Sequence, residues 1–111
     1  MHIPDGYVDI TIAVLFGALS VAILGLAARR VGRRVEGRAP LLGVVAAGIF
    51  AAQMLNWPIP GGTSAHFVGG AFAAILLGPH LGALCVATVV TIQALVFGDG
   101  GLVVLGANVF N

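Results

Sequence analysis

The longest uncharged run in the chain sets the strongest limit on its fold. Residues 10–28 form a stretch of 19 positions without a charged side chain. As an α-helix, this run is about 28 Å long, close to the roughly 30 Å hydrocarbon core of a bilayer. Only 8% of the residues are charged, against roughly 25% in soluble domains. The sequence therefore predicts a protein that lies in a membrane.

Four more apolar runs follow the first. Residues 41–57 begin after Pro40, which favours the first turn of a helix, and end at Trp57, a residue typical of the membrane interface. The later runs cover residues 66–78, 81–97 and 102–111. We expect an all-α, polytopic transmembrane helix bundle with about four complete spans and a truncated fifth.

The final run is too short to cross a bilayer as a helix. We therefore expect residues 1–111 to form a single transmembrane domain that is the N-terminal half of a longer protein. The alternative is that the last segment only dips into the membrane.

The positive charges predict the topology. All five cationic side chains are arginines, and all lie between Arg29 and Arg38. Short basic loops stay in the cytoplasm, so this segment is expected inside and the N-terminus outside, in a multi-pass protein of the cell membrane. A cleaved signal peptide would carry its positive charge before the apolar run. Here Asp5 and Asp9 precede it, so Met1 is expected to keep its free amine.

The first two residues offer a metal chelate. The α-amine of Met1, the amide nitrogen between Met1 and His2, and an imidazole nitrogen of His2 can close two fused rings in one plane. Planar nitrogen ligands suit Ni²⁺ and other late first-row ions. The alternative is that a histidine stands second by chance, since every translated chain starts with methionine.

A second histidine is expected on the same side of the membrane. His66 follows a turn-rich loop and opens the third apolar run, so the predicted topology brings it to the face of Met1 and His2. It could supply a fourth nitrogen, or it could be an ordinary interfacial histidine. His80 is expected on the opposite face and is left out of the site.

Polar residues gather at the same predicted end. Metal-bound imidazoles usually donate their other N–H to an oxygen of the protein or of water. Helix–helix hydrogen bonds and turn formation are equally plausible roles for such residues. The candidates for contact with the ligands are Ser64, Gln93, Asp99 and Asn108, with Thr63 and Asn111 nearby.

Several function classes lack support in the sequence. There is no P-loop and no His-Glu-x-x-His motif, and the arginines flank an apolar run instead of forming a nucleic-acid-binding surface. Two rivals remain. One is a haem-carrying membrane anchor that would use His66 and His80, although these are roughly 21 Å apart along one helix. The other is a purely structural membrane subunit.

Four segments together resemble one known family. They are MHIPDG at residues 1–6, GGTSAHFVGG at 61–70, IQALVFGDGG at 92–101 and LGANVFN at 105–111. This set is similar to the CbiM/NikM family, the substrate-binding membrane components of energy-coupling-factor transporters for cobalt and nickel. Members of that family are about twice as long, which agrees with the expectation of an N-terminal half.

The resemblance implies a transporter component and not an enzyme. Its metal ligands would be Met1, His2 and His66, and its substrate would be Co²⁺ or Ni²⁺. Its partners would be a membrane coupling subunit, two ATP-binding subunits that hydrolyse the ATP, a small accessory membrane subunit and the membrane lipids. The residues leave cobalt and nickel open. The family's role in corrinoid synthesis favours cobalt, and the affinity order of nitrogen sites favours nickel.

Overall fold

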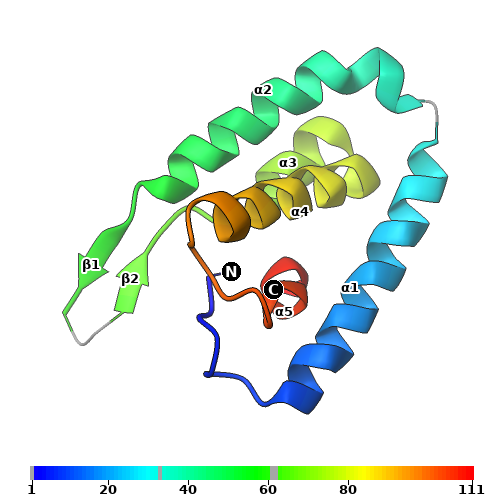
Figure 1. The fold of residues 1–111 in the computed structure, drawn as a ribbon. Helices are drawn as coiled ribbons and strands as arrows, with labels where there is room; N and C mark the ends of the chain where they lie inside the picture. The colour runs from blue at the N-terminus through cyan, green and yellow to red at the C-terminus, as the bar shows by residue number, and fades with distance from the viewer. Residues whose placement is uncertain (1, 33, 61–62) are drawn as a thin grey trace.

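The computed structural model describes residues 2–32, 34–60 and 63–111. Figure 1 shows two long helices that form a V around shorter elements. In chain order the elements are α1 (Ile10–Val31), α2 (Arg34–Met54), β1 (Trp57–Ile59), β2 (Thr63–Ala65), α3 (Gly70–Leu77), α4 (Pro79–Val96) and α5 (Leu105–Phe110).

The first helix begins and ends at residues suited to those places. The Asp9 carboxylate accepts a hydrogen bond of 2.8 Å from the backbone N–H of Thr11 and so caps α1. The same backbone hydrogen bond lowers the pKa of Asp9. At the other end, the N–H of Gly32 donates to the carbonyl of Ala28, and the φ of 50° at Gly32 turns the chain out of the helix.

The basic segment is mostly helical, and the prediction of a loop there was wrong. Arg29 and Arg30 lie in the last turn of α1, and α2 already begins at Arg34. Pro40 therefore lies inside α2 and not in its first turn. The prediction started the helix where the apolar run starts, but a helix can continue beyond the apolar run into a polar flank.

Three of the described helices are long and apolar enough to span a membrane: α1, Val35–Met54 within α2, and α4. The expected third span is reduced to α3, whose eight residues reach only about 12 Å. Helix α3 begins after Gly69, which has a left-handed φ of 82°. The expectation of four complete spans is not confirmed. The apolar run begins at His66, but the helix begins only at Gly70.

A small hairpin modifies the all-α prediction. Strands β1 and β2 pair antiparallel, with Trp57 opposite Ala65. The hairpin joins α2 to the segment that carries His66. The rest of the regular structure in the described residues is helical.

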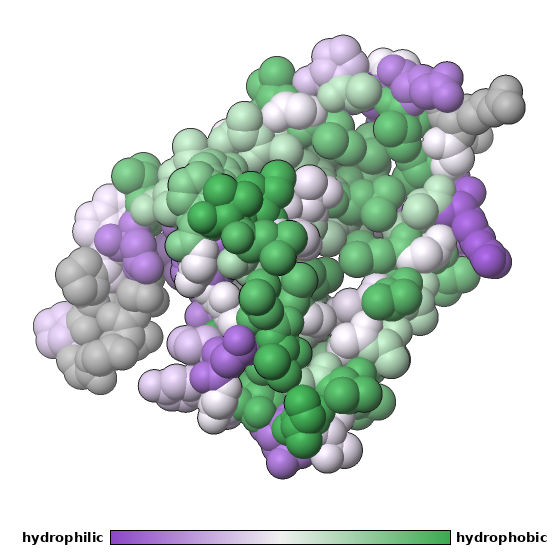
Figure 2. All heavy atoms as spheres, viewed as in Figure 1, coloured by the Kyte–Doolittle hydropathy of each residue, from purple (hydrophilic) through white to green (hydrophobic). Residues whose placement is uncertain are grey.

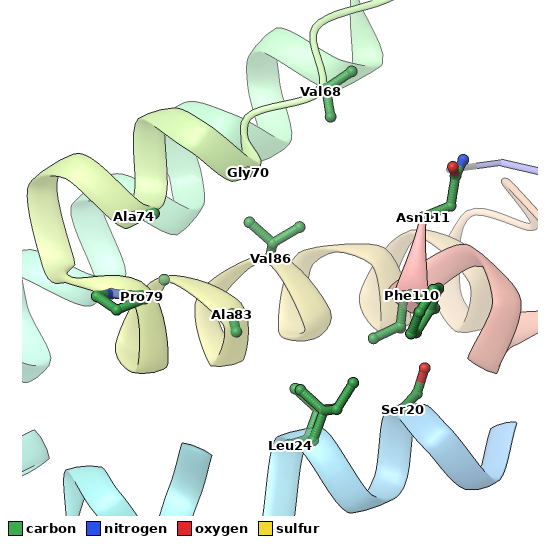
Figure 3. Close-up of a pocket in the computed structure, with 13 residues that line it drawn as sticks. Ser20, Leu24, Val68, Gly70, Ala74, Pro79, Ala83, Val86, Phe110 and Asn111 are labelled. Carbon is green, nitrogen blue, oxygen red and sulfur yellow. The ribbon is translucent and has the colours of Figure 1, made fainter. Parts of the chain in front are cut away.

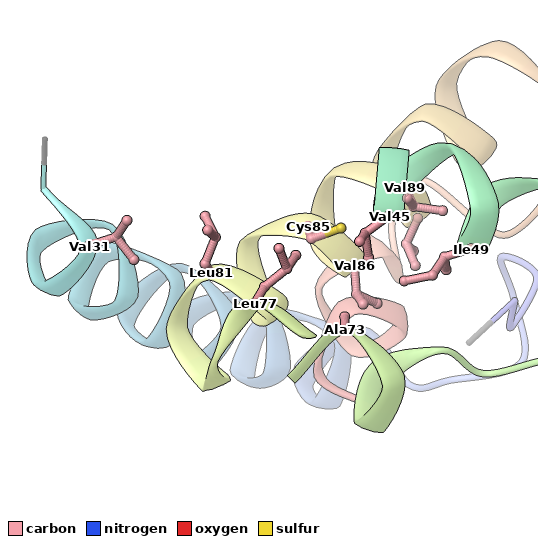
Figure 4. Packing of buried hydrophobic residues seen from close by; sticks show 10 residues of the cluster. Val31, Val45, Ile49, Ala73, Leu77, Leu81, Cys85, Val86 and Val89 are labelled. Carbon is pink, nitrogen blue, oxygen red and sulfur yellow. The ribbon is translucent and has the colours of Figure 1, made fainter. Parts of the chain in front are cut away.

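Helix α4 is the centre of the bundle, because α1, α2, α3 and α5 all contact it. Half of the residues in the apolar part of α4 are buried, whereas the buried share is 17% in α1 and 11% in α2. The buried cluster in Figure 4 contains residues from each of the helices α1, α2, α3 and α4. They are Val31, Val45, Ile49, Ala73, Leu77, Leu81, Cys85, Val86, Val89 and Val90. The outer sides of α1 and α2 remain apolar and exposed.

Helix α5 packs directly on the backbone of α1. A Cβ added at Gly106 would overlap the backbone of Gly17, so the two helices meet where neither has a side chain. Ser20 reinforces this contact by donating a hydrogen bond of 2.6 Å to the carbonyl of Gly106. This packing fixes the position of α5 beside the N-terminal segment (Figure 1).

The surface separates polar ends from an apolar middle. In Figure 2, hydrophilic residues gather near the junction of α1 and α2 and, at the other end, near the N-terminal segment, whereas green apolar residues cover the helices between them. A cavity of about 340 Å³ is lined mainly by apolar residues, with Ser20 and Asn111 as its polar side chains. Figure 3 shows these residues on α1, α3, α4 and the C-terminal end of the chain.

Candidate metal centre

The N-terminal segment is bound to α5 by a buried amide. The Asn108 side chain accepts a hydrogen bond of 2.8 Å from the N–H of Ile3 and donates one of 3.0 Å to the carbonyl of Ile3. The N–H of Gly101 donates to the same carbonyl at 2.9 Å. Asn108 is fully buried, so these contacts hold the backbone beside His2 in one place.

A carboxylate provides the second attachment. Asp5 accepts hydrogen bonds from three successive backbone N–H groups, at 3.0 Å from Leu102, 2.9 Å from Val103 and 3.3 Å from Val104. Hydrogen bonds to an ionised acceptor are stronger than neutral ones. Asp5 was not among the predicted site residues. Its place in the MHIPDG segment was the signal that could have identified it.

His2 is nearly buried and points at the end of α4. Its side chain is 10% exposed, and its Nε2 donates to Gln93 Oε1 at 2.9 Å. The Asp99 carboxylate lies 3.8 Å from the same nitrogen. Gly100 makes room for this arrangement, because a Cβ there would lie 3.2 Å from Asn108 Nδ2 and 3.6 Å from His2 Cα.

His66 lies beside His2, as the predicted topology required. The two ring centroids are 4.8 Å apart and the ring planes make an angle of 62°. The Nδ1 of His66 donates to the carbonyl of Phe67 at 3.1 Å. Each imidazole thus uses one nitrogen as a donor. Among the described residues, no hydrogen bond involves His2 Nδ1 or His66 Nε2.

The other predicted residues divide into those that join this cluster and those that do not. Gln93 and Asp99 face the His2 ring, whereas Asn108 binds the backbone of Ile3 instead of an imidazole. Asn111 lines the apolar cavity. Met1, which supplies the predicted amine, lies outside the described residues, as do the side chains of Thr63 and Ser64.

His80 lies at the opposite end of α4, in a pocket with Arg30 and Arg38. His80 and Gln93 are 13 positions apart in α4, which is about 20 Å along the helix. His2 and His66 lie beside Gln93. His66 and His80 therefore cannot be the two axial ligands of one haem in this chain, which removes the geometric basis of the haem alternative.

Side chains alone do not complete a metal site here. The described residues contain no group of three or more His, Cys, Asp or Glu side chains placed to hold an ion. Two imidazoles meet at this end, so a metal held here would need ligands beyond these two rings.

Three helices of membrane-spanning length and two neighbouring imidazoles at one end of the bundle are typical of a helical membrane protein with a polar binding site. The chain belongs to the family described as the cobalt uptake substrate-specific transmembrane region, which it matches over residues 2–111.

Individual relatives agree with this assignment. A Haloquadratum walsbyi protein, provisionally named as a metal transport protein, is 68% identical over 99% of this chain and 51% of its own length. A provisionally named fused nickel transport protein NikMN of Archaeoglobus fulgidus is 66% identical over all of this chain and 37% of its own. The chain thus spans about half or less of these relatives.

A solved structure has the same fold. The crystal structure of a truncated transition metal transporter superposes with a TM-score of 0.90 at 40% identity, covering 99% of this chain and 52% of the other. The family and the Archaeoglobus relative are both named for metal transport.

Proposed function

We propose that this chain is the substrate-capture component of an energy-coupling-factor uptake transporter and binds Co²⁺ or Ni²⁺ through its N-terminal residues. The observation that carries the proposal is the hydrogen bond from His2 Nε2 to Gln93 Oε1. An amide oxygen can only accept, so in the neutral ring Nε2 carries the proton and Nδ1 keeps its lone pair.

That tautomer matches the chelate. A metal held by the α-amine of Met1 and the amide nitrogen of His2 closes a five-membered ring. Adding Nδ1 of the same histidine closes a six-membered ring, and Nε2 is then free to donate outward. Ligand histidines commonly have such a donor contact, which orients the ring and raises its basicity.

His66 is proposed as the fourth ligand. Its Nδ1 donates to the carbonyl of Phe67, so its Nε2 can bind a metal. The ring lies 4.8 Å from that of His2. Together, Met1, His2 and His66 would supply four nitrogens, with Gln93 and Asp99 as outer partners of the His2 ring. Ser64 is also proposed as an outer partner of the ligands, on the basis of the sequence motif alone.

Nickel is the first metal to test. A site built from nitrogens alone follows the affinity order in which Ni²⁺ exceeds Co²⁺. The NikMN relative is named for nickel, whereas the family description names cobalt. We therefore expect both ions to bind and Ni²⁺ to bind more tightly.

The same proposal includes an orientation and partners. The arginine-rich end would face the cytoplasm, which places His2 and His66 outside. A membrane coupling subunit and two ATP-binding subunits would move the captured ion inward. The fused name of the Archaeoglobus relative supports an additional small membrane component.

The decisive experiment compares N-termini. The chain with its native start is titrated with Ni²⁺ by calorimetry beside a form that carries extra residues before Met1. We expect high-affinity binding with release of protons in the first form, because the amine and the amide must both lose protons, and none in the second. A His80→Ala variant with the native start should bind normally. Equal affinity in the extended form would refute the proposed chelate.

A further inference from the structure

The end of the bundle opposite His2 contains a pocket of different chemistry. Its volume is about 270 Å³, and α1, α2, α3 and α4 all contribute to it. Its polar side chains are Arg30, Arg38 and His80. The rest of its lining is Val31, Leu77, Gly78, Pro79 and Leu81.

No described side chain neutralises the positive charge in this pocket. Arg30 and Arg38 form no ion pair and no hydrogen bond with any side chain in the part of the chain that the structure describes. Asp5, Asp9 and Asp99 all belong to the other end, so Glu36 is the one acidic side chain in the basic segment of residues 29–38. Within the described residues, Glu36 pairs with neither arginine.

Two further features favour an anion. The pocket includes the first turn of α4, where backbone N–H groups without helical partners and the positive end of the helix dipole favour negative charge. The arginines reach it from two other helices, and guanidinium groups match the geometry of phosphate oxygens.

Three apolar residues of the pocket lining also belong to the buried cluster. Figure 4 shows Val31, Leu77 and Leu81 grouped at one end of the buried cluster. A ligand with a charged head and an apolar tail fits this combination, and basic pockets between transmembrane helices are known to hold anionic lipid head groups.

We propose that this pocket binds a phosphate group, held by Arg30, Arg38 and His80, with the adjoining apolar residues in contact with the chains of an anionic lipid. The site is independent of the metal centre, from which the length of α4 separates it.

The test is lipid binding by native mass spectrometry of the full chain released from detergent. The probes are dioleoyl phosphatidylglycerol and a galactosyl lipid with the same chains and no phosphate. We expect a preference for the phosphate lipid that falls roughly tenfold or more in R30Q/R38Q, because this variant removes both charged hydrogen-bond donors that face the phosphate.

Arg29→Gln is the matched control. Arg29 is exposed in the same turn of α1 but does not line the pocket. The preference should change less than twofold in this variant. Circular dichroism of all variants checks that the exposed substitutions leave the helices intact.

Inorganic phosphate in excess distinguishes the source of the ligand. If it leaves the lipid bound, the site takes a lipid head group, and if it displaces the lipid, the site takes phosphate in general. Either result supports the phosphate site. Equal binding of the two lipids, or an equal loss in Arg29→Gln and Arg30→Gln, would overturn it.

Discussion

The two ends of the bundle use polar residues in opposite ways. At the end that holds His2, buried amides and a carboxylate are hydrogen-bonded to the backbone or to a ring, so each group has a fixed place. At the end that holds His80, the cations of Arg30 and Arg38 are exposed and unpaired within the described residues.

This difference indicates that the end with His2 is preorganised for a ligand and that the end with His80 is not. Fixed donors and acceptors hold a ligand at low entropic cost, whereas exposed cations act mainly through charge, which salt screens. Affinity for a transition metal should therefore depend on individual residues at the first end and should be insensitive to substitutions at the second.

The histidines give the largest contrast. His2→Ala should reduce Ni²⁺ binding below detection, because it removes the ring that closes the chelate. His66→Ala should weaken binding but leave three nitrogens, and His80→Ala should have no effect. Calorimetric titration of all three variants with a native N-terminus provides the measurement. Loss of binding in His80→Ala, or none in His2→Ala, would reverse the roles of the two ends.

Gln93 tests the support behind the ligand. Gln93→Leu removes the acceptor for His2 Nε2, and loss of such a partner typically lowers metal affinity about tenfold to a hundredfold. Gln93→Glu keeps an acceptor oxygen and should retain most of the affinity. If both variants bind alike, the hydrogen bond does not orient the ring for metal binding.

Gly106 tests the close packing of α5 on α1. Gly106→Ala would press a methyl group into the backbone of Gly17, and such overpacking costs about 1–3 kcal/mol of the free energy of unfolding. Gly25→Ala in α1 is the control, since open space surrounds that position. Thermal unfolding in detergent compares them. A stable Gly106→Ala protein would mean that α5 can move away without cost.

The smallest effect concerns acid. The lowered pKa of Asp9 means that its cap stabilises the fold fully above the ordinary carboxyl pKa. That contribution is lost as the pH falls through the lowered pKa of the folded state. The difference in melting temperature between the wild type and Asp9→Ala should be present at neutral pH and vanish in strong acid. A difference that grows on acidification would contradict this sign.

The sequence predicted features that depend on local composition. The apolar runs of α1, α2 and α4 correspond to the three helices long enough to span a membrane. Counting crossings also brought His2 and His66 to one end, where their rings are neighbours. The ligand roles of these residues and the direction of the chain across the membrane remain predictions.

Other features depend on contacts that a local pattern does not encode. The attachment of Asp5 to the N–H groups of residues 102–104 joins positions almost a hundred residues apart. The hydrogen bond between Asn108 and the backbone of Ile3 likewise joins residues 105 positions apart in the sequence. The early start of α2 and the shortness of α3 differ from the predictions because the ends of the helices do not coincide with the ends of the apolar runs.

X-ray absorption at the nickel edge tests the central claim most directly. The chain with its native N-terminus and one equivalent of Ni²⁺ should show a four-coordinate, planar shell of nitrogens with the scattering pattern of two imidazole rings, and His66→Ala should remove one of these rings. A six-coordinate, oxygen-rich shell, unchanged when His2 and His66 are both replaced, would contradict the account.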